Sequence, residues 1–263
     1  MLKTSCLVRF ILLLVFCLHL GFQEVHAACD PVLDPCAPKK VLDQWNKSIS
    51  AGLNITKGNS ETTVLNLGGK ATRESNRNIY DLMAAYNYGE DSNAKTDQFG
   101  QTNRNDFRSQ LRYDRLVNER WFAGFGTFFL YDEIADVDYR LTLDPGFGYY
   151  FWKNPTVSFR LEGGPSYVFE REGGITHDYL APRIGDKFEW IISCTSKVYQ
   201  SASVLMDVEN SDNYLVIGEV GIESALATNL ALVFTIRQTY DNVPAKGREK
   251  EDLQAITSLK VAL

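Results

Sequence analysis

Apolar and polar residues alternate along most of the chain, from about residue 45 to its last residue. In the stretch FRSQLRYD (107–114), Phe107, Leu111 and Tyr113 share one side, and Arg108, Arg112 and Asp114 occupy the other. Successive side chains of a strand point to opposite faces, so a period of two predicts strands. No apolar pattern with helical spacing follows the first two dozen residues. We therefore expect an all-β protein.

The alternation predicts about twelve strands, which are separated by segments rich in Gly, Asn, Asp, Ser and Pro. One of them, 121–132, is apolar on both faces, so its register stays open. The predicted strands cover residues 45–56, 63–74, 78–89, 103–117, 121–132, 138–151, 156–170, 179–192, 197–207, 214–224, 230–241 and 253–263.

The connections between these strands alternate regularly in length. Each short turn lies between longer loops, and the short turns fall at 75–77, 118–120, 153–155, 193–196 and 227–229. An up-and-down outer-membrane barrel has short periplasmic turns, longer outer loops and an even number of strands. A Greek-key sandwich has no reason to keep this rhythm.

These features predict an antiparallel up-and-down transmembrane β-barrel of about twelve strands, with apolar faces toward lipid and polar faces toward the lumen. Aromatic residues near strand ends, such as Trp45, Trp121 and Trp190, agree with the girdles of such barrels. The alternative is a soluble periplasmic β-barrel or sandwich that binds a small ligand. The rhythm of the loops favours the membrane barrel.

The N-terminal segment has the features of a secretory signal peptide. The basic residues Lys3 and Arg9 precede a short apolar run at 10–22. The segment VHA (25–27) then supplies small residues at the positions that a signal peptidase recognises. We predict a signal peptide over 1–27, cleaved between Ala27 and Ala28. Residues 28–44 are expected to form either a periplasmic segment or a small plug, and residues 45–263 form the barrel.

Three of the five cysteines lie beyond the predicted signal peptide. The short spacing of Cys29 and Cys36 predicts a disulfide between them in an exported protein. Cys194 would then be a thiol without a partner. Lipidation of Cys29 is the alternative use of that residue, but His26 does not fit the usual lipoprotein signal.

The overall charge narrows the range of partners. The chain carries 27 Lys and Arg against 33 Asp and Glu, a formal net charge of −6, with no basic cluster. This balance argues against nucleic acid. A barrel implies outer-membrane lipids and lipopolysaccharide around it and the outer-membrane assembly machinery during insertion. Small ions or solutes are expected partners if the lumen is open.

The polar faces carry charges of both signs, and an unpaired buried charge costs several kcal/mol. One interpretation is a salt-bridge network that fills and stiffens the barrel. The other is a narrow pore whose charged lining screens small solutes. Within the set, Arg140, Arg160, Arg183 and Lys187 would favour anions if they were unpaired. The lumen candidates are Lys70, Asp81, Asp106, Arg108, Arg112, Asp114, Arg140, Asp144, Arg160, Glu162, Arg183, Lys187, Glu189, Glu219, Glu223 and Arg237.

Catalytic and metal chemistry find little support. His177, the one histidine beyond the predicted signal peptide, falls in the predicted outer loop 171–177. Glu219 and Glu223 are expected to pair with arginines rather than to act as acid and base. The acidic loops at 90–97 and 207–213 do not match a calcium loop, and no Cys/His cluster has zinc spacing. We therefore expect no enzyme, no metal and no cofactor.

Several blocks of the sequence resemble an uncharacterised family of bacterial proteins labelled as salt-induced outer membrane proteins. The blocks are 51–74, 112–122, 144–170, 180–190 and 239–253, so the likeness covers nearly all of the chain after Cys36. The resemblance implies an outer-membrane β-barrel in a Gram-negative-type envelope and a link to salt or osmotic stress. It implies no activity and no site residues.

Overall fold

The computed structural model describes residues 43–56, 61–93 and 98–263. None of these residues forms a helix long and apolar enough to cross a membrane. The strands are β1 (Trp45–Thr56), β2 (Glu61–Glu74), β3 (Asn78–Asn93), β4 (Gln98–Leu116), β5 (Trp121–Asp132), β6 (Val137–Lys153), β7 (Val157–Glu172), β8 (Ile175–Ser193), β9 (Ser196–Met206), β10 (Tyr214–Ala227), β11 (Leu230–Asp241) and β12 (Glu251–Ala262).

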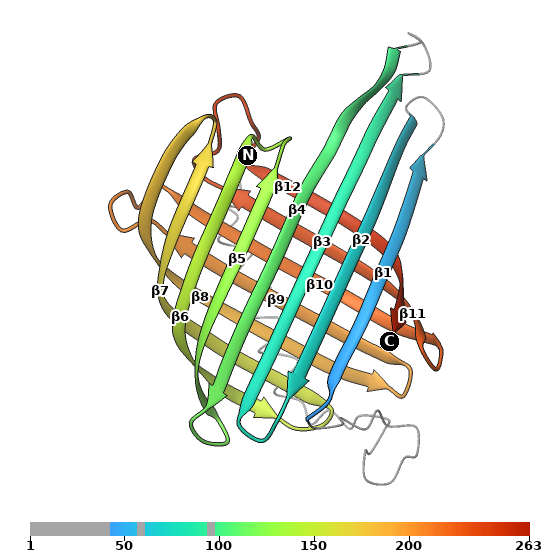
Figure 1. Cartoon of the computed structure of the whole chain (residues 1–263), viewed down its shortest axis with the longest axis vertical. Coiled ribbons are helices and arrows are strands. Elements are labelled where there is room, and N and C mark those ends of the chain that lie inside the picture. The colour runs from blue at the N-terminus through green and yellow to red at the C-terminus, as the bar shows by residue number, and fades with distance from the viewer. Residues whose placement is uncertain (1–42, 57–60, 94–97) are drawn as a thin grey trace, which may run out of the picture.

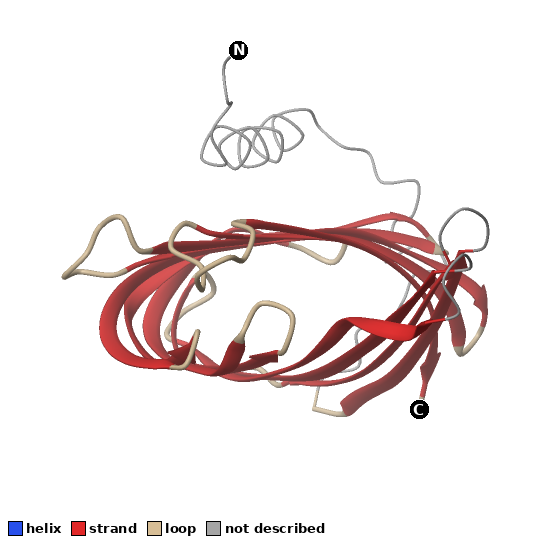
Figure 2. Ribbon diagram, turned by 90° about the horizontal axis from the view of Figure 1, so that it is seen from above, coloured by secondary structure: helices blue, strands red, loops and turns tan. Residues whose placement is uncertain are grey.

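Each strand pairs antiparallel with the next one along the chain, and β12 returns to pair with β1 (Figure 1). The sheet is therefore a closed barrel of twelve antiparallel strands. This confirms the predicted fold class and strand number. Viewed from above, the barrel has a flattened cross-section rather than a circular one (Figure 2).

The apolar faces of the strands lie on the outside. On β4, Phe107 and Leu111 are 36% and 54% exposed, whereas Arg108 and Arg112, which alternate with them, are buried. The same holds around the barrel, where exposed apolar side chains include Leu53 of β1 and Ile184 of β8. A soluble protein rarely exposes so much contiguous apolar surface. The polar faces of the strands therefore line the interior of the barrel.

Aromatic side chains form contacts near both ends of the strands. At the turn end, the Tyr80 ring packs between Trp45 and Tyr113, with ring centroids 6.1 and 5.1 Å apart. At the loop end, the rings of Tyr214 and Tyr240 stack at 5.9 Å. Two aromatic belts separated by an apolar band are typical of barrels that span a bilayer.

Two predicted loops are shorter than the sequence suggested. The predicted loop 171–177 is wrong, because β7 ends at Glu172 and β8 begins at Ile175. Gly173 and Gly174 have φ values of 58° and 76°, which close a two-residue hairpin turn. His177 therefore lies in β8 rather than in a loop. Polar residues continue the ladder above the apolar band, so alternation of hydrophobicity does not mark these strand ends.

A similar correction applies to the predicted connection 90–103, because β3 continues to Asn93 and β4 begins at Gln98. The register of β5, which the sequence left open, follows from its pairing with β4. Tyr113 pairs with Phe125, and Phe125 is 47% exposed on the outside. Gly124 and Gly126 therefore face the interior.

Candidate functional site in the barrel interior

Charged side chains from strands that are not neighbours meet inside the barrel. Arg112 of β4 reaches Glu162 of β7, with its Nη1 atom 3.1 Å from Oε1. Because β5 and β6 separate these strands, the contact lies across their inner surface. We call the five residues Arg112, Asp114, Arg160, Glu162 and Arg183 the arginine cluster.

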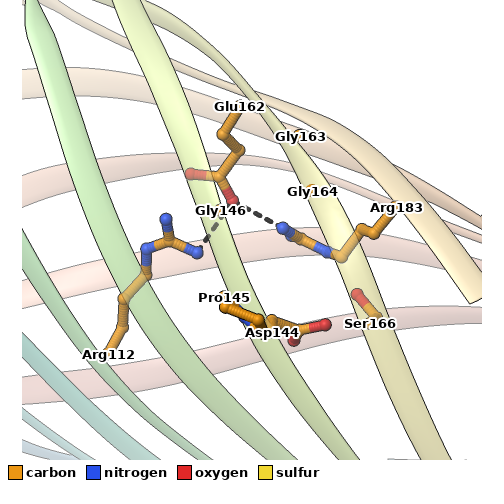
Figure 3. Close-up of a pocket in the computed structure, with 9 residues that line it drawn as sticks. All are labelled: Arg112, Asp144, Pro145, Gly146, Glu162, Gly163, Gly164, Ser166 and Arg183. Carbon is orange, nitrogen blue, oxygen red and sulfur yellow. Dashed lines mark hydrogen bonds and ion pairs between the residues drawn. The ribbon is translucent and has the colours of Figure 1, made fainter.

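Two carboxylates of the arginine cluster are shared among its three guanidinium groups. Asp114 accepts from Nε of Arg112 and Nη1 of Arg160, both at 2.8 Å. Glu162 accepts from Nη1 of Arg183 at 2.7 Å and lies 3.4 Å from Nη2 of Arg160. Figure 3 shows Arg112 and Arg183 converging on Glu162 from opposite sides. Every side chain of the cluster is mostly buried, and Asp114 is only 2% exposed.

Two glycines on the inner face of β5 make room for this cluster. A methyl group on Gly124 would lie 2.0 Å from Oδ1 of Asp114 and 3.1 Å from Nη2 of Arg112. One on Gly126 would lie 3.6 Å from Nη1 of Arg112. The side chain of Arg112 thus lies over two successive inward positions of β5 that carry no side chain.

A small cavity adjoins the cluster, between β6 and β7. Arg112, Asp144, Glu162, Ser166 and Arg183 contribute to its lining (Figure 3). Its volume is about 10 Å³, roughly the space for one water molecule and far below that of a ligand pocket. The arginine cluster is therefore a packed polar core and not a binding pocket.

A second group of charges closes around Arg140 near the loop end. Its guanidinium lies 2.5 Å from Oε2 of Glu170, 2.5 Å from Oε2 of Glu172 and 3.0 Å from Oδ2 of Asp241. These contacts join β6 and β7 to β11. Glu172 also accepts from the backbone N–H of Ala245 at 2.8 Å, which holds the connection between β11 and β12 against β7.

A third group of inward charges is far more exposed than these two. We call Lys70, Asp81, Lys187, Lys197 and Glu223 the hydrated group. Lys187 of β8 reaches Asp81 of β3 at 3.3 Å, and Lys197 lies 3.4 Å from Glu223. Exposed fractions are 46% for Lys70, 33% for Lys187 and 35% for Lys197. All five lie in the turn-end part of their strands, so water has access to them at this end of the barrel.

Amide side chains form a ladder across the inner faces of β1 to β4. Asn54 donates to Asn66 at 3.0 Å, Asn66 donates to Asn87 at 2.8 Å, and Asn87 donates to Asp106 at 2.8 Å. Arg108 donates to the same carboxylate of Asp106 at 2.6 Å. We call Asn54, Asn66, Asn87 and Asp106 the amide ladder.

The structure brings most of the sequence-predicted lumen residues into these groups. In the predicted basic group, Arg140, Arg160, Arg183 and Lys187 all have carboxylate partners. The condition under which they would favour anions is therefore not met. Arg237 and Glu219 pair with each other at 2.5 Å, whereas Asp144 lines the small cavity. The lumen candidates placed on inner faces are Lys70, Asp81, Asp106, Arg108, Arg112, Asp114, Arg140, Asp144, Arg160, Glu162, Arg183, Lys187, Glu189, Glu219, Glu223 and Arg237.

Sequence reasoning missed several residues of the interior. Glu170 and Glu172 follow Glu162 at even spacing on β7, so the same alternation would have found them. Arg104 and Asp252 were missed because they fall at the edges of predicted strands. The pairing of Arg104 with Asp252, at 3.0 Å, joins β4 to β12 and has no signal in the local sequence.

His177 contacts Asp207 and Tyr179 near the loop end of β8. Its Nε2 atom lies 3.1 Å from Oδ2 of Asp207, and its ring stacks on Tyr179 at 4.8 Å. Burial alone would raise the pKa of Asp207, but hydrogen bonds from His177 and from the backbone N–H of Glu209 hold that pKa below its ordinary value. These bonds orient the connection that follows β9.

The cysteine prediction needs a correction. Cys194, in the turn between β8 and β9, is disulfide-bonded, so the expectation of an unpaired thiol is wrong. Sequence spacing favours the nearest pair of cysteines and carries no information on distant ones. The described ranges hold no cysteine except Cys194. The predicted Cys29–Cys36 bridge and the predicted cleavage site at Ala27 and Ala28 lie outside the described residues.

A family model described as "Protein of unknown function, DUF481" matches residues 49–263. The chain belongs to this family. The match begins within β1 and includes every later strand of the barrel. No curated protein matches the chain.

Solved structures with a similar fold include several bacterial barrels. The NanC porin is 8% identical with a TM-score of 0.45, covering 82% of this chain and 97% of that one. The KdgM porin is 8% identical with a TM-score of 0.45, covering 84% and 99%. The translocator domain of the autotransporter NalP from Neisseria meningitidis is 12% identical with a TM-score of 0.39, covering 83% and 85%. Likeness at this level does not bear on what the chain transports or binds.

Proposed function

We propose that this protein is an outer-membrane barrel that provides a narrow, charge-lined pathway for small ions and solutes. The observation that carries the proposal is the hydrated group. Lys70, Lys187 and Lys197 face the interior and are still 33% to 46% exposed, which requires space for water beside them. Side chains packed against a closed wall would not be exposed to this extent.

The outer surface supports the membrane location. Apolar residues such as Leu53, Leu111 and Phe125 are exposed between the two aromatic belts, and the strands run up and down with closed pairing. These are the features of a barrel whose outside meets lipid. Outer-membrane lipids and lipopolysaccharide would surround it, and the assembly machinery would insert it.

The pathway is expected to discriminate weakly by charge. Lysines of the hydrated group alternate with Asp81 and Glu223, so both signs line the accessible side. The arginine cluster neutralises most of its own charge through Asp114 and Glu162. A narrow bore with balanced charge selects chiefly by solute size. We propose no catalytic role.

Current across a planar bilayer tests the proposal. Protein purified from the membrane fraction and shown to be folded should give steady unitary currents, with a reversal potential near zero in a salt gradient. Folded protein that inserts and carries no current would contradict the pathway. Inclusion of sugars of increasing size would then set the limiting solute radius.

A second candidate is a closed barrel with a structural role in the envelope. The bridges between Arg140 and Asp241 and between Arg112 and Glu162 favour it, because they tie distant strands together across the interior. This candidate predicts no current from folded protein. The link to salt or osmotic stress comes from the family resemblance, and growth of a deletion strain at high salt tests it under either function.

A further inference from the structure

The connection between β11 and β12 reaches the loop end of β7, although β8, β9 and β10 lie between β11 and β7 along the wall. The backbone N–H of Ala245 donates to Oε1 of Glu172 at 2.8 Å. A Cβ on Gly173, in the turn after β7, would lie 3.3 Å from Cβ of Ala245. Ala245 itself is 8% exposed. We call residues 242–250 the mouth loop, which is drawn in red at the top of Figure 1.

Two ion pairs show that the ends of the mouth loop are drawn inward. Five strand spacings of about 4.8 Å separate β6 from β11, a path of about 24 Å along the wall. Nη2 of Arg140 on β6 nevertheless lies 3.0 Å from Oδ2 of Asp241 at the end of β11. Arg104 of β4 lies 3.0 Å from Asp252, near the start of β12. Both pairs cross the interior of the flattened barrel (Figure 2), so the mouth loop lies over the opening.

The inner wall beneath the mouth loop is apolar and buried. Val168, Tyr179, Ala181 and Leu205 form a cluster in which each side chain is at most 8% exposed. The Tyr179 hydroxyl donates to Glu170 at 3.4 Å, which places this cluster next to the acidic residues around the mouth loop. Side chains this buried are shielded from water. The loop end of the interior thus differs from the turn end, where the hydrated group lies.

The charges that hold the mouth loop are unbalanced. Glu170, Glu172 and Asp241 all meet the single guanidinium of Arg140. Three ionised carboxylates against one guanidinium leave two negative charges, in a group whose side chains are at most 16% exposed. A proton on one carboxylate removes one of these charges and gives that group an O–H donor toward its neighbours.

Glu172 is the carboxylate best placed to take this proton. It is the last residue of β7, beyond the outward ring of Phe169, so it lies outside the apolar band. Burial raises its pKa to about 7; the charge of Asp241 acts in the same direction and that of Arg140 against it. The ionisable groups around it are Arg140 of β6, Glu170 of β7, His177 and Tyr179 of β8, Asp207 after β9 and Asp241 of β11, whereas Lys246, Arg248, Glu249 and Lys250 of the mouth loop are exposed.

The sign of the pH dependence follows from this raised pKa. With the mouth loop moved away, Glu172 would be solvated and would titrate near its ordinary value, about 4.3. The closed arrangement therefore binds the proton more tightly than the open one. Its advantage is complete below about pH 4.3 and is lost as the pH rises through about 7.

We propose that the mouth loop is a lid, which closes the outer mouth of the barrel when Glu172 is protonated and moves away when that carboxylate ionises. Ionisation places a third negative charge beside Arg140 and opposes the contact of Glu172 with the mouth loop. The effect on current rests on the proposed pathway. The movement of the lid does not, and it has a readout of its own.

Distances between two spin labels test the movement. The labels are attached to Lys246→Cys in the mouth loop and to Asp178→Cys, an exposed outward position of β8, in lipid vesicles at pH 5 and at pH 9. A single short distance at pH 5 should become longer and broader at pH 9. Glu172→Gln, which stays neutral and keeps an acceptor for Ala245, should give the short distance at both values.

Glu119→Gln is the matched control, because this exposed carboxylate lies in the turn between β4 and β5. It should respond to pH as the unsubstituted protein does. The same distance at pH 5 and pH 9 in the unsubstituted protein would overturn the proposal, and so would an unchanged pH response in Glu172→Gln.

A disulfide across the contact tests whether the lid blocks the pathway. Gly173→Cys and Ala245→Cys place their Cβ atoms about as close as a disulfide requires. Current at pH 9 should be several-fold smaller in the oxidised double variant than after reduction, and reduction should not change the current of protein without added cysteines. Equal currents before and after reduction would overturn the lid as a closure.

The two experiments separate failure of the lid from failure of the pathway. Absence of current from every folded variant would contradict the pathway, and the label distances would still decide whether the lid moves. Gly173 has a φ of 58°, so a shift in gel mobility on heating must show that the double variant is a folded barrel. The labelled variants leave that turn intact.

Discussion

The arginine cluster and the hydrated group lie in two halves of the barrel interior that share the same alternating sequence pattern. They differ in how far their charged side chains are exposed to water. In the arginine cluster, Asp114 and Glu162 are 2% and 8% exposed and bind guanidinium groups from three strands. In the hydrated group, Asp81 and Glu223 are 22% and 21% exposed and meet lysines. One half is a packed polar core, and the other borders water.

The charges do not explain this difference, because both halves mix the two signs. What differs is the neighbouring strand surface. Gly124 and Gly126 of β5 leave space for Arg112 to lie flat and reach partners on another strand. A guanidinium also offers several donors in a fixed fork, whereas an ammonium is a hydrated point charge. Glycine spacing, together with Arg rather than Lys, therefore distinguishes the packed half.

The largest expected effect is the loss of a shared carboxylate from the packed half. Asp114→Ala removes the carboxylate that Arg112 and Arg160 both contact at 2.8 Å, and removing one partner of a buried ion pair costs about 3–5 kcal/mol. Asp81→Ala, in the hydrated half, should cost about 1 kcal/mol or less because water replaces the carboxylate. Urea unfolding of both variants in lipid vesicles gives the two free energies of unfolding. Equal losses would contradict the distinction between the halves.

Replacing glycine by alanine should change the free energy of unfolding by a smaller amount, and the change should differ between crowded and uncrowded glycines. A Cβ on Gly164 would lie 2.2 Å from the carbonyl oxygen of Pro145, a backbone atom that cannot rotate away. Gly164→Ala should therefore cost about 1–3 kcal/mol. Gly69→Ala meets nothing within 4 Å and should be neutral or stabilising by up to about 1 kcal/mol. The same urea titration measures both, and a destabilised Gly69→Ala would argue against this account of packing.

Charge selectivity should respond to the hydrated half more than to the packed half. Lys70→Glu reverses a charge that is 46% exposed, so the reversal potential should move toward cation preference. Arg183→Ala changes a charge that is 20% exposed and already paired with Glu162, so its shift should be smaller. Reversal potentials in a salt gradient compare the two. A larger shift for Arg183→Ala would place the conducting path along the arginine cluster.

The smallest expected effect is at Asp207, outside both halves. Its pKa is lowered in the folded protein, so its contribution to stability is complete above the ordinary value, about 3.9, and is lost as the pH falls through the lowered pKa. The connection 208–213 should resist pepsin at pH 5 and become susceptible only in stronger acid. In Asp207→Asn, the connection 208–213 should be as susceptible to pepsin at pH 5 as it is in stronger acid. Cleavage of the wild type at pH 5 would contradict this role.

The sequence predicted the fold well because each of the twelve strands shows its own alternation of polar and apolar residues. Alternation in 107–114 identified β4, and turn residues such as Gly173 and Gly174 separated the strands. It also identified inward charges such as Arg160 and Glu162. It missed the polar ends of strands, as at His177, because hydrogen bonding continues there without a hydrophobic signal.

Which inward charges meet was not predictable from the sequence. The contacts of Arg112 with Glu162 and of Lys187 with Asp81 depend on the flattening of the barrel and on register summed over several strands. Small shifts in strand pairing would change these partners without changing the alternation. The same limit applies to the pairing of β1 with β12, which covers only Ser48–Ala51 of β1 and appears only when all twelve strands are placed.

Water access to two inward serines tests the central distinction most directly. Ser201 of β9 lies beside Glu219 in the hydrated half, and Ser166 of β7 is 1% exposed in the packed half. Each is replaced by cysteine and exposed to a small, membrane-impermeant, charged thiol reagent in vesicles. The account predicts fast modification of Ser201→Cys and strong protection of Ser166→Cys. Equal protection of both, in barrels shown to be folded, would mean that the interior is closed throughout and would contradict it.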